Sequence, residues 1–352
     1  MSGLLDAGPA RYDALIGVGG IGAGILFALE GNHDLGRNES RGGRLLESRD
    51  YCKLHIISHF AGVFAGARPE GRPFHVLPVG KVGCDAAGDR LLAEMREAGL
   101  DCRFVESVPD LPTLFAVCYQ FPDGAGGNLT PVNAAPCRLG EADLDAAVPW
   151  LEKYGARAIA LAAPEVPLAM RAGLLARATR TGAFRVASFV PGEMAAALEG
   201  GLLDRVDLLA VNEDEAAALT GVPFSGANPA FLLGACADFA ARRPGLKILL
   251  SVGPAGVYGF EAGRWVHRPA LGVKPVSTAG AGDTLLGGIL AALAAGWPFL
   301  PGEEAGAGGL RSALDFGNFA AGLSVLSPHT IDPGLNLESL RAAAPRYGYS
   351  VR

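Results

Sequence analysis

Between residues 158 and 252, short apolar segments alternate with segments of helical periodicity. Strands are predicted at 158–161, 184–189, 206–211 and 247–252, and helices at 168–179, 194–198, 213–219 and 230–241. Apolar strands separated by helices form mainly parallel sheets that are covered on both faces. The pattern therefore predicts an α/β fold with a mainly parallel central sheet. Ligands of such folds bind at the carboxyl ends of the strands.

The N-terminal part of the chain alternates less regularly. Further strands are predicted at 14–18, 54–58, 74–79 and 113–120. Leu91, Leu92, Met95 and Ala98 mark an amphipathic helix that Gly99 closes. Polar, glycine-containing stretches at 31–53 and 121–131 interrupt this pattern and are predicted to leave the main body. Near the other end, we expect a flexible loop at 301–309 and a last helix around 313–325.

Composition excludes several classes of protein. The chain has 352 residues and a net charge of −6, which gives no general attraction to nucleic acid or anionic membranes. No apolar run approaches the length of a membrane span, and the N-terminus lacks the pattern of a signal peptide. The six cysteines are scattered without a CxxC pair, so they predict neither a zinc site nor a disulfide framework. We expect a cytoplasmic protein with one large α/β domain or two smaller ones.

The stretch STAGAGDTLLGG at 277–288 is a glycine-rich turn that runs into an apolar helix. Free amide groups and the positive end of the helix dipole at such a place bind anions such as phosphate. Asp283, at the helix start, could accept a proton from an attacking hydroxyl, as phosphoryl transfer requires. Taken alone, these residues also fit a tight strand-to-helix turn with a capping aspartate.

A second glycine motif, from Gly17 to Gly22, matches G-x-G-x-x-G after a predicted strand. It is the first half of a dinucleotide-binding fingerprint. The second half requires a helix and then a strand that ends in an acidic residue about 20 residues on. Asp34 and Glu39 lie instead in a polar segment that predicts neither element. We favour glycines at a crowded strand end and keep a nicotinamide-dependent oxidoreductase as an alternative function.

Four segments together resemble motifs of the ribokinase or PfkB family of carbohydrate kinases. They are STAGAGDTLLGG at 277–288, VNEDE at 211–215, SVGPAG at 251–256 and VGKVGCDAAG at 79–88, and they occur in the order of the family's motifs. The resemblance implies a single ribokinase-like kinase domain over residues 1–352. It also implies a small β lid built from about 23–57 and 112–138.

The resemblance implies roles for individual residues. Asp283 stands at the position of the catalytic base, and Gly280, Ala281 and Gly282 would offer their amides to the transferred phosphoryl group. Glu165 matches a substrate contact. ATP would lie among Asn212, Glu215, Ser251, Gly253, Gly256, Thr278 and Asn318.

Asn212 and Glu215 are also the candidate Mg²⁺ residues, which would contact the ion through water. By itself, however, NEDE before an apolar helix is also a plain N-cap with acidic first-turn residues.

The chain departs from the family pattern on the substrate side. Gly22 stands near the place of an aspartate that holds sugar hydroxyls, and residues 58–63 lack the paired glycines and the asparagine of a sugar-binding stretch. His59 is a candidate member of a rebuilt site. Ser277 and the stretch at 327–329 also depart from the pattern and argue against a monovalent-cation site.

The sequence thus predicts an ATP- and Mg²⁺-dependent kinase that phosphorylates a hydroxyl of a small sugar-like or nucleoside-like molecule. Besides the oxidoreductase, the alternative is a non-catalytic family member that binds a ligand as a sensor. The family resemblance favours ATP over ADP as donor and implies a homodimer through the lid. Neither nucleic acid nor a membrane is expected as a partner.

Overall fold

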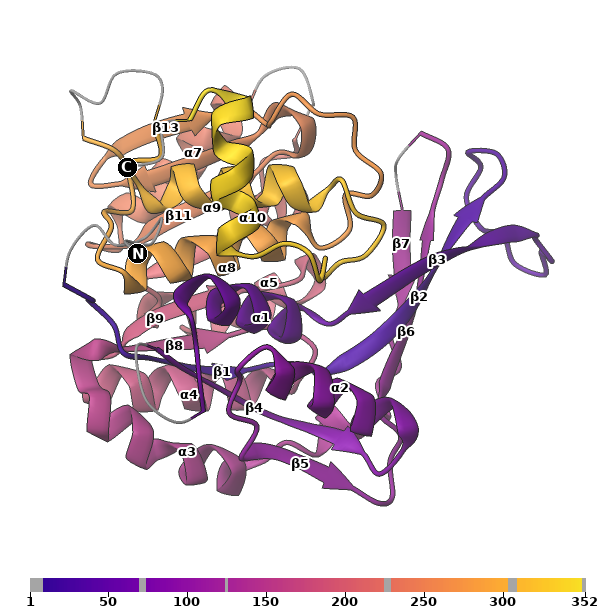
Figure 1. Ribbon diagram of the computed structural model, residues 1–352, viewed down its shortest axis with the longest axis horizontal. Helices are drawn as coiled ribbons and strands as arrows, with labels where there is room; N and C mark the ends of the chain where they lie inside the picture. Colours follow the sequence, from indigo (N-terminus) through magenta and orange to yellow (C-terminus); the bar gives the residue numbers. More distant parts are fainter. Residues whose placement is uncertain (1–8, 70–73, 124–125, 225–228, 303–308, 350–352) are drawn as a thin grey trace.

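The computed structural model describes residues 9–69, 74–123, 126–224, 229–302 and 309–349, which form a nine-stranded sheet and a four-stranded sheet (Figure 1). In spatial order, the large sheet contains β13 (Arg264–Arg268), β12 (Val257–Glu261), β11 (Lys247–Ser251), β10 (Leu208–Asn212), β9 (Phe184–Ser188), β8 (Ala158–Ala162), β1 (Ala14–Val18), β4 (His75–Gly83) and β5 (Phe104–Val108). The strands from β11 to β5 are parallel, and β12 and β13 form an antiparallel hairpin at the edge.

Helices cover both faces of the large sheet. One face carries α1 (Lys53–Ala65), α2 (Ala86–Glu97), α8 (Ala281–Ala294), α9 (Ala313–Ser324) and α10 (Leu337–Ala343). The other face carries α3 (Glu141–Tyr154), α4 (Leu168–Thr181), α5 (Met194–Glu199), α6 (Glu213–Thr220) and α7 (Ala230–Ala241). Each set of helices buries its own apolar cluster against the sheet. The predicted α/β fold, a mainly parallel sheet between two helical layers, is confirmed.

The strand order of the large sheet changes direction in its middle, at β1. Strand β1 is buried along its whole length, as expected of a strand covered on both faces, and it lies between β4 and β8. The strand order changes direction at β1, because the chain continues to β4 on one side and to β8 on the other. In open parallel sheets, a crevice for ligands opens beyond the strand ends at such a point.

The small sheet contains β3 (Gly43–Tyr51), β2 (Gly22–Leu29), β6 (Leu114–Gln120) and β7 (Gly126–Leu129), in that order. It stands out from the main body on one side (Figure 1). Strand β1 passes directly into β2, and β3 passes directly into α1. The small sheet is therefore joined to the body close to the carboxyl end of β1.

The predicted strand at 54–58 is wrong, because these residues belong to helix α1. Leu54, Ile57, Ala61 and Phe64 are buried at helical spacing, and α1 packs against α8. A short apolar run does not by itself distinguish a buried helix from a strand. Residues 53–57 accordingly lie in the main body and not in the small sheet.

Two further expectations concern the loop at 301–309 and membrane-spanning helices. The loop predicted at 301–309 falls mostly on residues 303–308, which lie outside the described residues. Within the described part of the chain, no helix is both long and apolar enough to cross a membrane.

Candidate functional site

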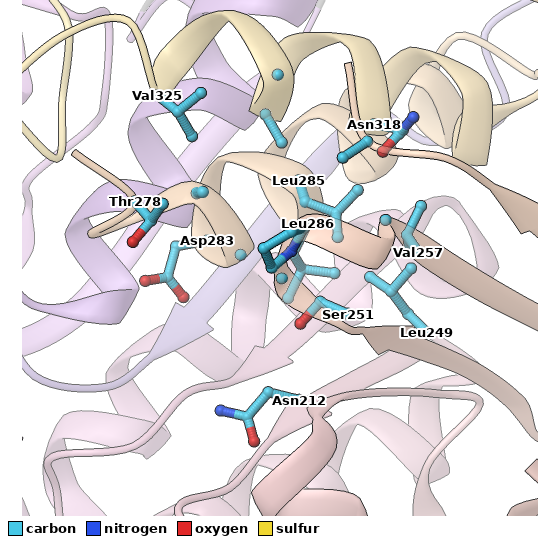
Figure 2. Close-up of a pocket in the computed structure, with 18 of the residues that line it drawn as sticks. Asn212, Leu249, Ser251, Val257, Thr278, Asp283, Leu285, Leu286, Asn318 and Val325 are labelled. Atoms are coloured by element: carbon cyan, nitrogen blue, oxygen red, sulfur yellow. The ribbon is translucent and has the colours of Figure 1, made fainter. Parts of the chain in front are cut away.

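A cleft of about 700 Å³ lies between the carboxyl ends of β10 and β11, the start of α8 and one side of α9 (Figure 2). It brings together segments that are far apart in the sequence. Ten of the residues predicted from the sequence line it: Asn212, Glu215, Ser251, Gly253, Gly256, Thr278, Ala281, Gly282, Asp283 and Asn318.

The glycine-rich turn ends at Gly280, which is the N-cap of α8 and has a left-handed φ of +75°. That conformation strains any residue with a side chain, and glycine adopts it freely. The first helical bond follows at once, from the Thr284 amide to the Gly280 carbonyl at 2.9 Å. Among the described residues, the amides of Gly282 and Asp283 have no acceptor. The start of α8 therefore presents free donors and the positive end of the helix dipole to the cleft.

Asp283 lies at the same end of the cleft as Thr278 (Figure 2). Burial raises the pKa of Asp283 to about 7, from an ordinary value of 3.8. Lys53 opposes this shift, whereas the carboxylates of Glu165, Glu215 and Asp50 add to it. A carboxylate with a pKa near 7 can exchange a proton with a bound molecule at neutral pH.

Lys53, which the sequence analysis missed, is the cation of the site. It begins α1, lines the cleft, and places its Nζ 3.1 Å from Oε1 of Glu215. Burial alone would lower the pKa of Lys53, but the surrounding carboxylates of Asp283, Glu215 and Glu165 raise it. Lys53 therefore carries its positive charge at neutral pH.

Glu165, which follows β8, caps the start of α1. Its Oε2 accepts a hydrogen bond of 3.2 Å from the Lys53 amide, in place of a side-chain cap from the N-cap residue Cys52. A Cβ at Gly20 would lie 2.6 Å from Oε2 of Glu165, so glycine at 20 leaves room for this carboxylate. Burial is the main cause that raises the pKa of Glu165. Glu165 does not line the cleft, but its charge acts on Asp283.

Asp50 is a second acidic residue that the sequence analysis did not identify. It lies near the end of β3, and its Oδ2 accepts a hydrogen bond of 2.9 Å from the Cys118 thiol. Burial raises its pKa, although hydrogen bonds from Cys118, Tyr51 and Thr330 oppose the rise. Asp50 also lies outside the cleft lining and acts on Asp283.

Four of the predicted residues do not line the cleft: Glu165, Gly280, Gly22 and His59. Gly280 is the N-cap of α8, and its backbone lies against Thr330. Gly22 begins β2, where a Cβ would lie 2.8 Å from the Cys52 Sγ. His59 does not follow a strand, because it lies within α1, and burial lowers its pKa to about 4.

Asn212 and Glu215 form a reciprocal capping box at the start of α6. The Glu215 amide donates to Oδ1 of Asn212 at 2.8 Å, and the Asn212 amide donates to Oε2 of Glu215 at 2.9 Å. Because Lys53 takes the other oxygen of Glu215, direct coordination of a metal would break existing bonds. Among the described residues, no group of three or more His, Cys, Asp or Glu side chains could hold a metal ion. The pair fits Mg²⁺ only through ordered water, since this ion keeps several waters.

The opposite end of the cleft is apolar. Leu249, Val257, Leu285 and Leu286 lie near it (Figure 2), and Leu271 lines it as well. The cleft thus joins a charged end at Asp283 to an apolar slot of the kind that accepts a flat ring.

Two polar or glycine positions in the slot also have structural roles. The Asn318 Nδ2 donates to the Pro269 carbonyl at 2.9 Å and so fixes the segment that leads into Leu271. Gly256 lines the cleft, but a Cβ there would lie 2.1 Å from the Arg268 carbonyl oxygen.

The motif from Gly17 to Gly22 finds no support as a dinucleotide site. Strand β1 leads into strand β2, whereas the fingerprint requires a helix at this point. A Cβ at Gly17 would lie 2.7 Å from Leu54 Cδ1, and one at Gly19 would lie 2.8 Å from Leu54 Cβ. These glycines let α1 approach the strand end, which agrees with the crowded strand end favoured above.

Comparison with known proteins identifies the family. The model of the pfkB family of carbohydrate kinases matches residues 74–336. Ribokinase from Staphylococcus aureus (strain COL) is 24% identical over 253 residues, which are 70% of this chain and 74% of the relative. The chain therefore belongs to the pfkB family, and it is a phosphotransferase with an alcohol group as acceptor.

Solved structures agree on the fold. Ribokinase from Cryptococcus neoformans var. grubii serotype A, in complex with ADP, has a TM-score of 0.73 at 19% identity and covers 94% of this chain and 99% of its own. Ribokinase from Arabidopsis thaliana, complexed with ribose and ATP, has a TM-score of 0.65 at 22% identity and covers 94% and 98%. The fold is ribokinase-like.

Proposed function

We propose that this kinase transfers the γ-phosphoryl group of ATP to a hydroxyl of a small neutral sugar-like or nucleoside-like acceptor, with Asp283 as the base. The observation that carries the proposal is the position of Asp283. Its carboxyl, with a pKa of about 7, stands at the free amide end of α8, inside a cleft with an apolar slot at its other end. Burial and neighbouring carboxylates are the usual means of tuning a carboxylate for base catalysis at neutral pH.

In the proposed step, the acceptor oxygen bonds to the γ-phosphorus, and the bond from that phosphorus to the β,γ-bridging oxygen breaks. The acceptor proton passes to the Asp283 carboxylate, and ADP leaves with the electron pair. The amides of Gly282 and Asp283, together with Lys53, would bind the charge on the transferred group. When bound, Mg²⁺ neutralises phosphate oxygens, and Asn212 and Glu215 would hold its water ligands.

The donor would place its base in the apolar slot near Asn318 and its phosphates toward Thr278 and Asp283. Gly253 fits this orientation, because a Cβ there would meet nothing within 4 Å and the backbone is open to a ligand. The similarity to ribokinases crystallised with ADP and with ATP supports ATP as the donor.

The acceptor would lie on the other side of Asp283, against Glu165 and Asp50. Both carboxylates act electrostatically on Asp283 although neither lines the nucleotide cleft. Carboxylates accept hydrogen bonds from hydroxyls and repel anions. We therefore expect a neutral acceptor with several hydroxyls, and poor turnover of sugar acids and sugar phosphates. Gly22 and His59 have no contact that supports a substrate role.

A panel of sugars, polyols, nucleosides, sugar acids and sugar phosphates, assayed for ADP formation with MgATP, tests the function. Turnover of a neutral hydroxyl compound is expected, and no turnover of any compound would contradict it. Asp283→Asn should lower kcat by about 10²–10⁴-fold while ADP binding, measured by calorimetry, stays within a few-fold. The exposed Asp238 on α7 gives the matched control Asp238→Asn, which should retain full activity.

We also propose that the small sheet pairs with that of a second copy. It exposes apolar side chains on three of its strands, namely Leu45, Phe115 and Leu129. Exposed apolar residues gathered on one element are typical of contact surfaces. Light scattering after size-exclusion chromatography should give the mass of a dimer, and Leu45→Glu should shift it to that of a monomer. A monomeric wild-type protein would contradict the proposal.

A further inference from the structure

The segment around Thr330 runs beside the end of β3, although the two are far apart in the sequence. The Thr330 amide donates to the Arg49 carbonyl at 3.0 Å, and the Tyr51 amide donates to the Thr330 Oγ1 at 3.1 Å. The Arg49 amide also donates to the His329 Nδ1 at 3.0 Å. The backbone of β3 is thereby held on both sides of Asp50.

The other side of Thr330 touches the turn that begins α8. A Cβ placed on Gly280 would lie 2.8 Å from the Thr330 Cβ and 3.0 Å from its carbonyl oxygen. The backbone of Gly280 therefore rests directly on Thr330, whose exposed fraction is only 3%. Thr330 thus contacts both the end of β3 and Gly280, the N-cap at the candidate phosphate-binding turn.

The strand end that Thr330 holds leads directly to Lys53, the first residue of α1. Tyr51 is followed by Cys52 and then by Lys53, which begins α1 and pairs with Glu215 at 3.1 Å. Lys53 and the amides after Gly280 approach the same end of the cleft from different parts of the chain. Thr330 bonds to Arg49 and Tyr51, just before Lys53, and lies against Gly280, just before those amides.

We propose that Thr330 is a positioning residue that sets the turn at 280–283 relative to Lys53. The inference rests on the proposed function, in which the turn and Lys53 bind the same phosphoryl group. Because β3 belongs to the small sheet, a movement of that sheet would reach the turn through Thr330. The backbone amides would then be aligned for transfer only when the small sheet is in place over the acceptor.

The test compares Thr330→Val, which removes the hydroxyl, with Thr330→Ser, which keeps it. Thr220→Val on α6 is the matched control, because it removes a hydroxyl bonded at 2.8 Å to the Ala216 carbonyl, away from the turn. Hydrogen exchange is followed in the presence of ADP for the amides of residues 279–284, with those of β8 and β9 as reference. If Val at this position prevents folding, Thr330→Ala provides the same comparison.

In Thr330→Val the amides of Ala281 and Thr284, which donate to the Thr278 and Gly280 carbonyls, should exchange about tenfold faster, with the reference strands unchanged and Thr330→Ser close to wild type. On the fastest acceptor of the panel, kcat should fall about tenfold while the Kd for ADP changes less than twofold. The proposal would be overturned if exchange of the turn did not change, or if exchange rose equally in β8 and β9. Equal effects of Thr330→Val and Thr330→Ser would also overturn it.

The two proposals can fail separately. If the wild-type protein phosphorylates nothing in the panel while the turn responds to Thr330→Val as described, the proposed function is wrong and the link between Thr330 and the turn stands. If phosphorylation occurs and Thr330→Val retains the wild-type kcat, the positioning role is wrong and the proposed function stands.

Discussion

The ammonium group of Lys53 lies 3.1 Å from the Glu215 carboxylate, and this ion pair joins the start of α1 to the start of α6. Glu165 accepts the amide of the same lysine, so Lys53 is held by acidic residues from two other parts of the chain. The cation therefore has a fixed place beside Asp283. Its charge lowers the pKa of that aspartate, against the larger effect of burial.

Replacing Lys53 should lower activity through two effects. Lys53→Met removes the cation that would meet the transferred phosphoryl group, and it leaves Asp283 with an even higher pKa. We expect kcat at pH 7 to fall about 100-fold, the scale on which a single preorganised charge acts. Lys53→Arg, which keeps the charge, should lose much less. A Lys53→Met variant that folds and retains the wild-type kcat would refute the role.

We expect kcat/KM to fall as the pH is lowered, which gives the pH profile an acidic limb. A base must be deprotonated to accept the acceptor proton, so kcat/KM should rise with pH and level off above the pKa of about 7 of Asp283. The proton on the γ-phosphate of ATP could produce a similar limb. Lys53→Met distinguishes the two, because it should move a limb due to Asp283 to higher pH and leave one due to ATP in place.

Asp283→Asn should be more stable than the wild type in alkaline solution. The folded protein holds the Asp283 pKa at about 7, above its ordinary value of 3.8, so protonation of Asp283 favours the folded state. This contribution is fully present below pH 4 and is lost as the pH rises through 7. Asparagine does not ionise, so at pH 8.5 calorimetry should give the variant a Tm a few degrees higher, and the gap should narrow at pH 5. A constant gap would contradict the raised pKa.

The C-terminal half of the site could be predicted because its signals are local. The turn before Asp283 and the strand ends at Asn212 and Ser251 each combine a periodic apolar segment with glycine or a capping residue. Strand β1 (Ala14–Val18) and helix α7 (Ala230–Ala241) were predicted with their observed bounds for the same reason. A pattern that extends over one element can be read without knowledge of its neighbours.

Lys53 and Asp50 could not be found in this way. Their importance comes from contacts with Glu215 and Cys118, which lie far along the chain, and no local spacing encodes these contacts. The strand wrongly predicted at 54–58 also hid the start of α1. Helical spacing from Leu54 to Phe64 was the available signal, but it becomes visible only over a longer window.

Glycines 280 and 282 should respond oppositely to alanine. A Cβ on Gly282 would meet nothing within 4 Å, and its backbone is helical, so Gly282→Ala should keep or raise the Tm. Its methyl group would enter the proposed site of the γ-phosphoryl group, and we expect the Kd for ATP to rise at least tenfold. Gly280→Ala places a side chain at φ +75° against Thr330 and should lose about 1–3 kcal/mol of stability. Thermal unfolding and calorimetry measure both effects, and an active, stable Gly282→Ala would contradict the phosphate site.

Asn212 combines a structural contact with a proposed metal contact, and two substitutions separate them. Asn212→Ala removes the cap that accepts the Glu215 amide at 2.8 Å, at a cost of about 1 kcal/mol, so the Tm should fall by about 2–4 °C. Asn212→Asp keeps the acceptor and should keep the Tm. If Asn212 also holds water on Mg²⁺, the Mg²⁺ concentration for half-maximal rate should rise several-fold in Asn212→Ala and stay near wild type in Asn212→Asp. A lower Tm with unchanged Mg²⁺ dependence would mean that Asn212 acts only as a cap, because the loss of a helix cap alone does not change how the phosphates bind their metal.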